Sequence, residues 1–308
     1  GLHLYPGLIA PTTSLGLTEI NAVRATLDVS EVGEYTPDVQ SWIAVNPDSE
    51  LLPVARANGI THALIVPQGA IVSGQSGLIA LDGWTMEQIT VKRPIALHLF
   101  WPNMQLNTTP REQTRDKSKW KSLDDQAKER RKKLKEIEDF FAEAQAYAKA
   151  KQAADRPAGG TLESVPAWEA MLPFVQGKIP LMVHADDIQQ IKAAVNWAVA
   201  NGYRMILAGG RDAWMVANLL AEKRIPVIYE SVFELPARDT ASYEVHFRAP
   251  AVLYKAGVRV VFSEGSGAPS ATQVRNLPVD LRLGQEVTPA LVRQLKPHTN
   301  IKIFTDRR

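Results

Sequence analysis

The sequence predicts an α/β fold in which strands alternate with helices and close into a TIM-type (β/α)8 barrel. Short apolar runs rich in Ile, Val and Leu recur along the chain, as expected for strands buried on both faces. In the C-terminal half these runs alternate with helical stretches, which is the rhythm of βαβ units. Crossovers of this kind are right-handed, and a barrel needs about 250 residues, so one barrel nearly fills the 308-residue chain.

Seven apolar runs are the predicted strands, and each ends in a polar or glycine-rich turn. They are Leu4–Ala10, His62–Val66, Ile95–Phe100, Ile179–His184, Met205–Ala208, Val227–Tyr229 and Val258–Phe262. Three helices are predicted between the later runs: Ile188–Asn201, Ala213–Lys223 and Ala249–Ala256. The first of these has an apolar face and stops at Gly202, a common residue at helix C-termini.

The segment from Arg111 to Arg156 differs, because it is dense in Lys, Arg, Glu, Asp, Gln and Ala. Apolar residues keep a helical spacing within it, at Leu134, Ile137, Phe140, Phe141, Ala144 and Tyr147. This pattern predicts a long amphipathic helix with one solvated face, inserted into a single domain that spans 1–308. The residues that follow it, Arg156–Gly160, are typical of a linker.

The composition excludes several classes of protein. Thirty-five basic residues balance 33 acidic ones, so nothing favours nucleic acid or an anionic membrane as a partner. The chain has no cysteine, which excludes disulfides, thiolate metal sites and a cysteine nucleophile. No apolar run reaches the roughly 20 residues of a membrane span, and no signal peptide is visible.

Three stretches resemble the amidohydrolase superfamily, and imidazolonepropionase-like members in particular. Leu4–Leu17 resembles their first barrel strand, Lys178–Asp187 the fifth, with its metal-binding histidine, and Ala256–Gly265 the eighth, which carries a catalytic aspartate. Further stretches are similar to a divergent branch of the superfamily: Asn46–Ile60, Val66–Ser76, Leu81–Thr85 and His98–Pro102. Members of that branch often follow an export signal, so the resemblance implies a periplasmic or other extracytoplasmic location.

The resemblance implies divalent metal at the C-terminal ends of the strands, where it would activate water and polarise a carbonyl. The His-x-His pair would fall near Pro11 to Thr13, where there is no histidine, and Ala208 replaces the strand-six ligand. His184 is kept, and Ser263 or Glu264 stands at the aspartate position. The resemblance therefore implies a degenerate site in which His184 and Glu264 hold one ion, zinc in the first place, or no metal at all.

Seven residues form the predicted site. We expect His184, Glu264, Asp186 and Arg211 in catalysis, and Gln68, His98 and Glu230 in substrate binding. A loop after the second strand is indicated by Gln68 together with Gly69 and Gly74.

Structural alternatives stay open for the charged residues of this site. His184 at a strand end can be hydrogen-bonded without metal, and Glu264 can accept backbone N–H bonds in its loop. Arg211 can bind a carboxylate or phosphate, or pair with Asp186, Asp187 or Glu264.

The ends of the chain depart from the superfamily pattern. Members carry a small β-sandwich before the first strand and after the last helix, whereas this chain begins at the first strand. After the eighth strand we expect only a short helix in Val287–Lys296 and a strand at Ile301–Phe304. The chain is then a fragment of a longer protein, a homo-oligomer, or a subunit whose partner covers the barrel ends.

Three functions compete on these grounds. The first is a hydrolase of a C–N bond in a small cyclic amide or amino-acid derivative, with one metal near His184 and Glu264. The second is an inactive barrel that binds a small molecule or another subunit, since most metal ligands are missing. The third is a metal-free hydrolase that uses Arg211, Asp186, Glu264 and His184 for acid–base chemistry.

Overall fold

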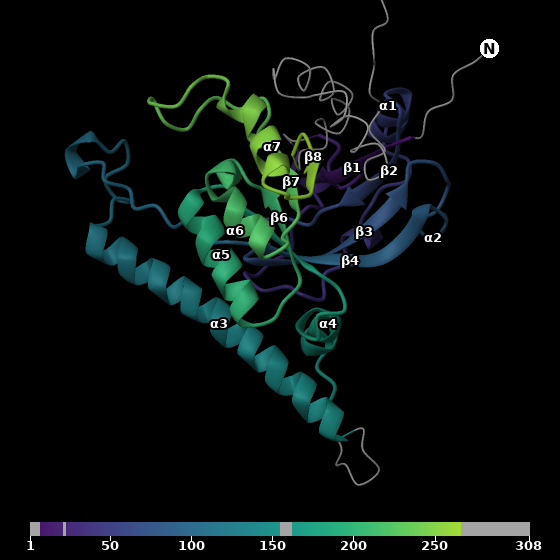
Figure 1. The fold of residues 1–308 in the computed structure, drawn as a ribbon. Coiled ribbons are helices and arrows are strands. Elements are labelled where there is room, and N and C mark those ends of the chain that lie inside the picture. The colour runs from purple at the N-terminus through teal and green to yellow at the C-terminus, as the bar shows by residue number, and fades with distance from the viewer. Residues whose placement is uncertain (1–6, 21–22, 155–161, 266–308) are drawn as a thin grey trace, which may run out of the picture.

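A computed structural model describes residues 7–20, 23–154 and 162–265. It forms an eight-stranded sheet, ordered β1 to β8, that curls into a distorted TIM-type barrel with helices outside it (Figure 1). The strands are β1 Leu8–Thr13, β2 Ile60–Ile65, β3 Val72–Ala80, β4 Thr90–Phe100, β5 Leu181–Ala185, β6 Met205–Gly209, β7 Val227–Tyr229 and β8 Val260–Phe262. Within the described residues no strand pairing joins β8 to β1, so the barrel is nearly but not fully closed.

The helices follow the strands in the second half of the chain. The α-helices are α1 Leu51–Ala57, α2 Met86–Ile89, α3 Leu123–Ala154, α4 Pro166–Val175, α5 Ile188–Ala200, α6 Ala217–Glu222 and α7 Val245–Lys255. Short 3-10 turns are η1 Arg24–Thr26, η2 Ser41–Ile43, η3 Arg111–Gln113 and η4 Ala213–Val216. The predicted helix at Ala213–Lys223 is therefore split into η4 and α6.

The distortion lies around β3, which pairs antiparallel with both β2 and β4, while the other pairs are parallel. Short connections join β2 to β3 and β3 to β4, and without a long crossover two neighbouring strands must run antiparallel. The interpretation of Gly74 as part of a loop is wrong, because Gly74 lies inside β3. A Cβ at Gly74 would sit 2.6 Å from the Val39 carbonyl oxygen, so glycine lets the 31–40 segment pack on this strand.

The long charged segment forms α3 from Leu123 onward, as predicted, whereas residues 111–122 contain only the 3-10 turn η3. Its buried side chains are Ile137, Phe141, Ala144 and Ala148, while the opposite face is solvated. Phe141 packs edge-on against Trp197 of α5, with ring centroids 4.8 Å apart. Helix α3 therefore lies on the outside of the barrel and packs against α5. It runs past α5 toward α4, the next helix in the chain (Figure 1).

Two apolar clusters hold the barrel together. The larger lies between the sheet and the surrounding helices and includes Leu99, Phe174, Leu207 and Leu220. The smaller joins inward-facing side chains of five strands: Leu64, Ala96, Met182, Ala208 and Ile228, with Ile206 and Val261 packed against them. Because strand side chains alternate between faces, the residues two positions further on also face the interior, nearer the C-terminal mouth.

Some expectations lie outside the described residues: the start of the first predicted strand before residue 7, the 156–160 linker, and the helix and strand beyond residue 265. None of the helices in the described ranges combines the length and hydropathy that crossing a membrane requires.

Candidate functional site

A layer of polar side chains lies above the inner apolar cluster at the C-terminal mouth of the barrel. Two residues beyond Ala96, Met182, Ile228 and Val261 stand His98, His184, Glu230 and Ser263. Thr12 of β1 contributes to the same layer through its contact with Ser263. The alternation of the strands thus places polar groups where barrels of this type carry their chemistry.

Glu230 supplies the carboxyl group of this layer. The Thr12 hydroxyl donates to its Oε1, and Thr12 Oγ1 lies 2.6 Å from Ser263 Oγ. Burial raises the pKa of Glu230 to about 7, a rise opposed by the hydrogen bond from Thr12 and reinforced by the negative charges of Asp186 and Glu234. A carboxyl group with this pKa can both take and return a proton near neutral pH.

His98 and His184 form a pair through their ring nitrogens. His98 Nδ1 lies 2.9 Å from His184 Nε2, and the His184 ring stacks on Phe100 at a centroid distance of 4.1 Å. Burial lowers the pKa of His184 to about 3, and burial together with His184 lowers that of His98 well below its ordinary value. Both imidazoles are therefore neutral at physiological pH, and one donates to the other.

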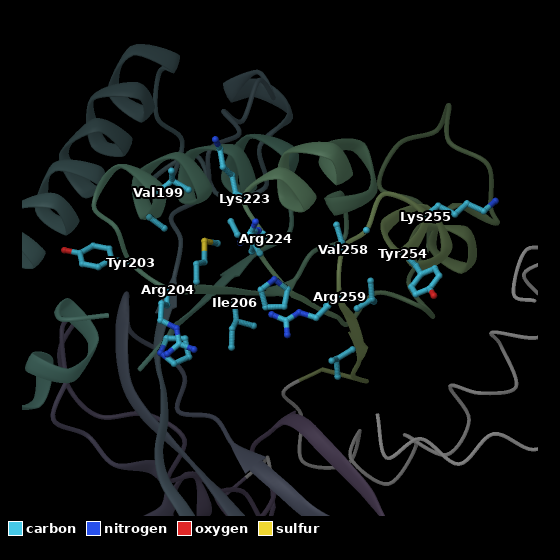
Figure 2. A pocket seen from close by; sticks show the side chains of 18 residues that line it. Val199, Tyr203, Arg204, Ile206, Lys223, Arg224, Tyr254, Lys255, Val258 and Arg259 are labelled. Atoms are coloured by element: carbon cyan, nitrogen blue, oxygen red, sulfur yellow. The ribbon is translucent and has the colours of Figure 1, made fainter. Parts of the chain in front are cut away.

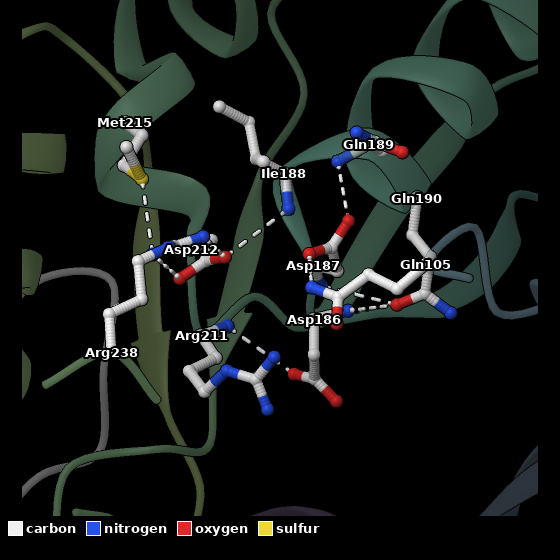
Figure 3. A network of polar contacts seen from close by, with 10 residues as sticks. All are labelled: Gln105, Asp186, Asp187, Ile188, Gln189, Gln190, Arg211, Asp212, Met215 and Arg238. Carbon is white, nitrogen blue, oxygen red and sulfur yellow. Dashed lines mark hydrogen bonds and ion pairs between the residues drawn. The ribbon is translucent and has the colours of Figure 1, made fainter. Parts of the chain in front are cut away.

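Asp186 and Arg211 extend side by side from the ends of β5 and β6 (Figure 3). The Arg211 backbone N–H donates to Asp186 Oδ1 at 3.3 Å. Burial raises the pKa of Asp186, and the backbone N–H and guanidinium of Arg211 oppose that rise. Within the described residues the buried Nε of Arg211 has no hydrogen-bond partner, which leaves a donor for a ligand.

Gly209 creates the space for the Asp186 carboxylate. A Cβ at Gly209 would lie 2.5 Å from Asp186 Oδ1, and its φ of 86° favours glycine. The absence of a side chain at Gly209 therefore leaves room for the Asp186 carboxylate at the end of β6.

The neighbouring carboxylates have structural roles. Asp187 caps α5, accepting from the Gln189 N–H at 2.7 Å, and also accepts from Gln105. Asp212 is buried and bound by Arg238, with Nη2 2.6 Å from Oδ2 (Figure 3). Asp187 is thus committed to helix capping, which leaves Asp186 as the carboxylate beside Arg211.

The remaining predicted residues lie on loops at the strand ends. Glu264 directly follows Ser263 after β8 and is half-buried. Gln68 is half-buried in the loop after β2, and its backbone N–H donates to the Val29 carbonyl at 2.7 Å.

The metal donors do not make a site of the usual kind. Across residues 7–20, 23–154 and 162–265 no three His, Asp or Glu side chains are placed to hold one ion. The Nε2 of His184 is instead engaged with His98. Structural and catalytic zinc sites use at least three protein ligands, so the donors of this layer do not fit a zinc ion.

Thr12 and Ser263 were not among the seven residues of the predicted site, although the sequence offered Ser263 as an alternative to Glu264 at the aspartate position. Thr12 lies where the resemblance predicts a histidine pair and Ser263 where it predicts an aspartate, and together they link β1, β8 and Glu230. The strand alternation could have indicated Ser263, because it stands two residues after the inward-facing Val261 and therefore faces the same side.

The comparisons with known proteins agree with this architecture. The fold is a distorted TIM-type barrel, and it is similar to that of a solved amidohydrolase. The chain superposes on the crystal structure of an amidohydrolase from Thermotoga maritima MSB8 with a TM-score of 0.75 and 22% identity, over 92% of this chain and 72% of that one. No family model matches the sequence, and no curated protein matches it.

Proposed function

We propose that this chain hydrolyses a carbon–nitrogen bond, other than a peptide bond, in a small cyclic amide or amino-acid derivative. The observation that carries the proposal is the Glu230 carboxyl, hydrogen-bonded to Thr12 at the barrel mouth, with a pKa near 7. Amide hydrolysis requires a proton to leave water and to reach the departing nitrogen, and one group with this pKa can do both. The likeness to an amidohydrolase structure supports the same class of reaction.

In the proposed reaction, the Glu230 carboxylate takes a proton from water as the water oxygen bonds to the amide carbonyl carbon. The tetrahedral intermediate then collapses, the C–N bond breaks, and Glu230 returns the proton to the leaving nitrogen. Water and amide thus become a carboxylic acid and an amine. Thr12 donates to the ionised carboxylate, and Ser263 in turn can donate to Thr12.

Arg211 suggests the kind of substrate. Its buried Nε has no hydrogen-bond partner among the described residues, and a guanidinium binds a carboxylate through paired N–H groups. Asp186 holds the Arg211 backbone in place. A substrate with a free carboxylate, such as an amino-acid derivative, would be oriented by Arg211 with its amide directed toward Glu230.

No step of this reaction is routed through a metal. The predicted zinc at His184 and Glu264 stays a prediction, and metal analysis of the purified protein tests it. The proposal expects much less than one equivalent of zinc per chain, and no loss of turnover when a chelator is added. If the protein held a full equivalent of zinc, and chelation removed both the zinc and turnover, the metal rather than Glu230 alone would be required for hydrolysis.

An inactive barrel that binds a small molecule is the alternative. It is favoured by the neutral His98–His184 pair, in which His98 Nδ1 and His184 Nε2 bond to each other rather than to a reacting group. This arrangement can line a binding pocket without taking part in catalysis.

A substrate panel separates these functions. Cyclic amides and N-acyl amino acids, each with and without a free carboxylate, are incubated with the protein, and ring-opened or deacylated products are measured by mass spectrometry. The proposal expects hydrolysis of a carboxylated member and its loss in Arg211→Gln. Binding of a member by calorimetry without any product would support the alternative.

A further inference from the structure

A large cavity lies at the opposite end of the barrel from the polar layer (Figure 2). It has a volume of about 930 Å³ and is formed by the segments that lead into β6, β7 and β8. Its floor includes Ile206 and Val261, which also pack against the inner apolar cluster. A concave site of this size with an apolar floor is in the range of small-molecule pockets.

The polar side chains around this floor are mainly cationic. Five basic residues line the cavity, and no Asp or Glu does: Arg204, Lys223, Arg224, Lys255 and Arg259. Lys223 pairs with Glu222 outside the lining. The guanidinium groups of Arg224 and Arg259 form no ion pair in the part of the chain that the structure describes. Arg259 extends across the middle of the cavity toward Ile206 (Figure 2).

Arg224 stands in a backbone position that glycine usually fills. Helices α1, α4, α5 and α7 each end with glycine at positive φ, namely Gly59, Gly177, Gly202 and Gly257. Helix α6 ends instead with Arg224 at a φ of 55°, the one non-glycine residue with positive φ among the described residues. A side chain is disfavoured in this conformation, so an arginine here suggests that its guanidinium is needed.

We infer that this cavity binds a small organic phosphate, with the phosphate held by Arg224 and Arg259 and an apolar body lying on the floor. Two arginines without carboxylate partners match a dianion better than a neutral ligand. The chain's own residues 266–308 are a poor match by charge, because they carry seven Lys or Arg against three Asp or Glu. This site is independent of the proposed hydrolase function.

The test is a calorimetric titration of the full chain with n-octyl phosphate. Octyl glucoside, octanoate and inorganic phosphate are titrated in parallel. We expect one equivalent of octyl phosphate to bind, octanoate and inorganic phosphate to bind at least tenfold more weakly, and octyl glucoside not to saturate. If octyl glucoside bound as tightly as octyl phosphate, the requirement for an anion would be overturned. If octanoate bound as tightly, the preference for phosphate over carboxylate would be overturned. If inorganic phosphate bound as tightly, the role of the apolar body would be overturned.

Two variants and a control connect the binding to the cavity. Arg224→Gly and Arg259→Gln should each weaken octyl phosphate binding about tenfold, while Lys149→Ala, on the exposed face of α3, should not. Arg224→Gly should keep the wild-type melting temperature or raise it, because glycine suits the positive φ. Unchanged affinity in both arginine variants would overturn the proposal.

Discussion

The Thr12 hydroxyl donates to the Glu230 carboxylate, although the two residues are 218 positions apart in the sequence. The contact joins the first strand to the end of the seventh, and Ser263 extends it to the eighth strand. It brings the two open edges of the barrel together at the mouth. The Thr12 hydroxyl that links these strands thus also opposes the rise that burial causes in the pKa of the proposed catalytic carboxyl.

Replacing Glu230 with glutamine should change how stability depends on pH. The folded-state pKa of about 7 lies above the ordinary value of 4.5, so the folded state binds the proton more tightly. The stability that Glu230 contributes is therefore present below pH 4.5 and is lost as the pH rises to 7, by roughly 3 kcal/mol. Measured by urea unfolding, the free energy of unfolding of Glu230→Gln relative to wild type should therefore increase by about this amount between pH 4.5 and 7. The exposed Glu143→Gln is the control, and a difference independent of pH would contradict the prediction.

Removing the Thr12 hydroxyl should raise the pKa of Glu230. The hydrogen bond from Thr12 stabilises the ionised carboxylate, and a hydrogen bond to a charged group contributes about 1.5 kcal/mol. In Thr12→Val the inflection of the pH–rate profile should therefore move up by about one pH unit. Thr12→Ser keeps the donor and should keep the inflection. If Thr12→Val lost activity with the inflection unmoved, Thr12 would have only a structural role.

The histidine pair should make the protein sensitive to acid. Since burial lowers the pKa of His184 to about 3, its stabilising contribution is complete above pH 6.5 and is lost as the pH falls toward 3, by roughly 5 kcal/mol. The double variant His98→Gln, His184→Gln should lose stability less steeply over this range in chemical denaturation. His62→Gln, on β2, is the control and should follow wild type. Parallel curves for the double variant and wild type would show that the pair is not kept neutral by the fold.

Substituting Gly209 should cost more stability than its backbone conformation alone explains. Gly209→Ala places a Cβ against the Asp186 carboxylate, whereas at Gly202, with a φ of 71°, nothing lies within 4 Å. Gly202→Ala should therefore cost about 1 kcal/mol from positive φ, and Gly209→Ala at least about 1 kcal/mol more. Urea unfolding measures both. Equal costs would mean that Asp186 moves away freely and is not held by β6.

Most of the fold follows from the sequence because apolar runs and helical spacing record burial directly. Strand β3 was missed because Val72–Ala80 carries Ser, Gly and Gln at its centre, which resemble a loop. These small residues are buried because other segments pack on them. A Cβ at Gly77, for example, would lie 2.8 Å from Trp42. Such packing depends on tertiary contacts that a local pattern does not contain.

The site was predicted only in part, for a related reason. His98, His184 and Glu230 are prominent residue types at strand ends, so their position suggested a role. Thr12 and Ser263 carry hydroxyl groups that are common anywhere in a chain, and only the folded barrel brings Thr12 to Glu230 and Ser263 to Thr12. The pairing of the two histidines likewise required the relative positions of β4 and β5.

The rate of hydrolysis by Glu230→Gln, compared with wild type from pH 5 to 9, tests the central claim most directly. The substrate is the one that the panel identifies, and Glu143→Gln is the matched control. We predict a wild-type rate that rises through an inflection near pH 7, a fall of about a hundredfold or more in Glu230→Gln, and no inflection in that variant. A Glu230→Gln enzyme with the wild-type rate and inflection would contradict the assignment of Glu230 as the acid–base group.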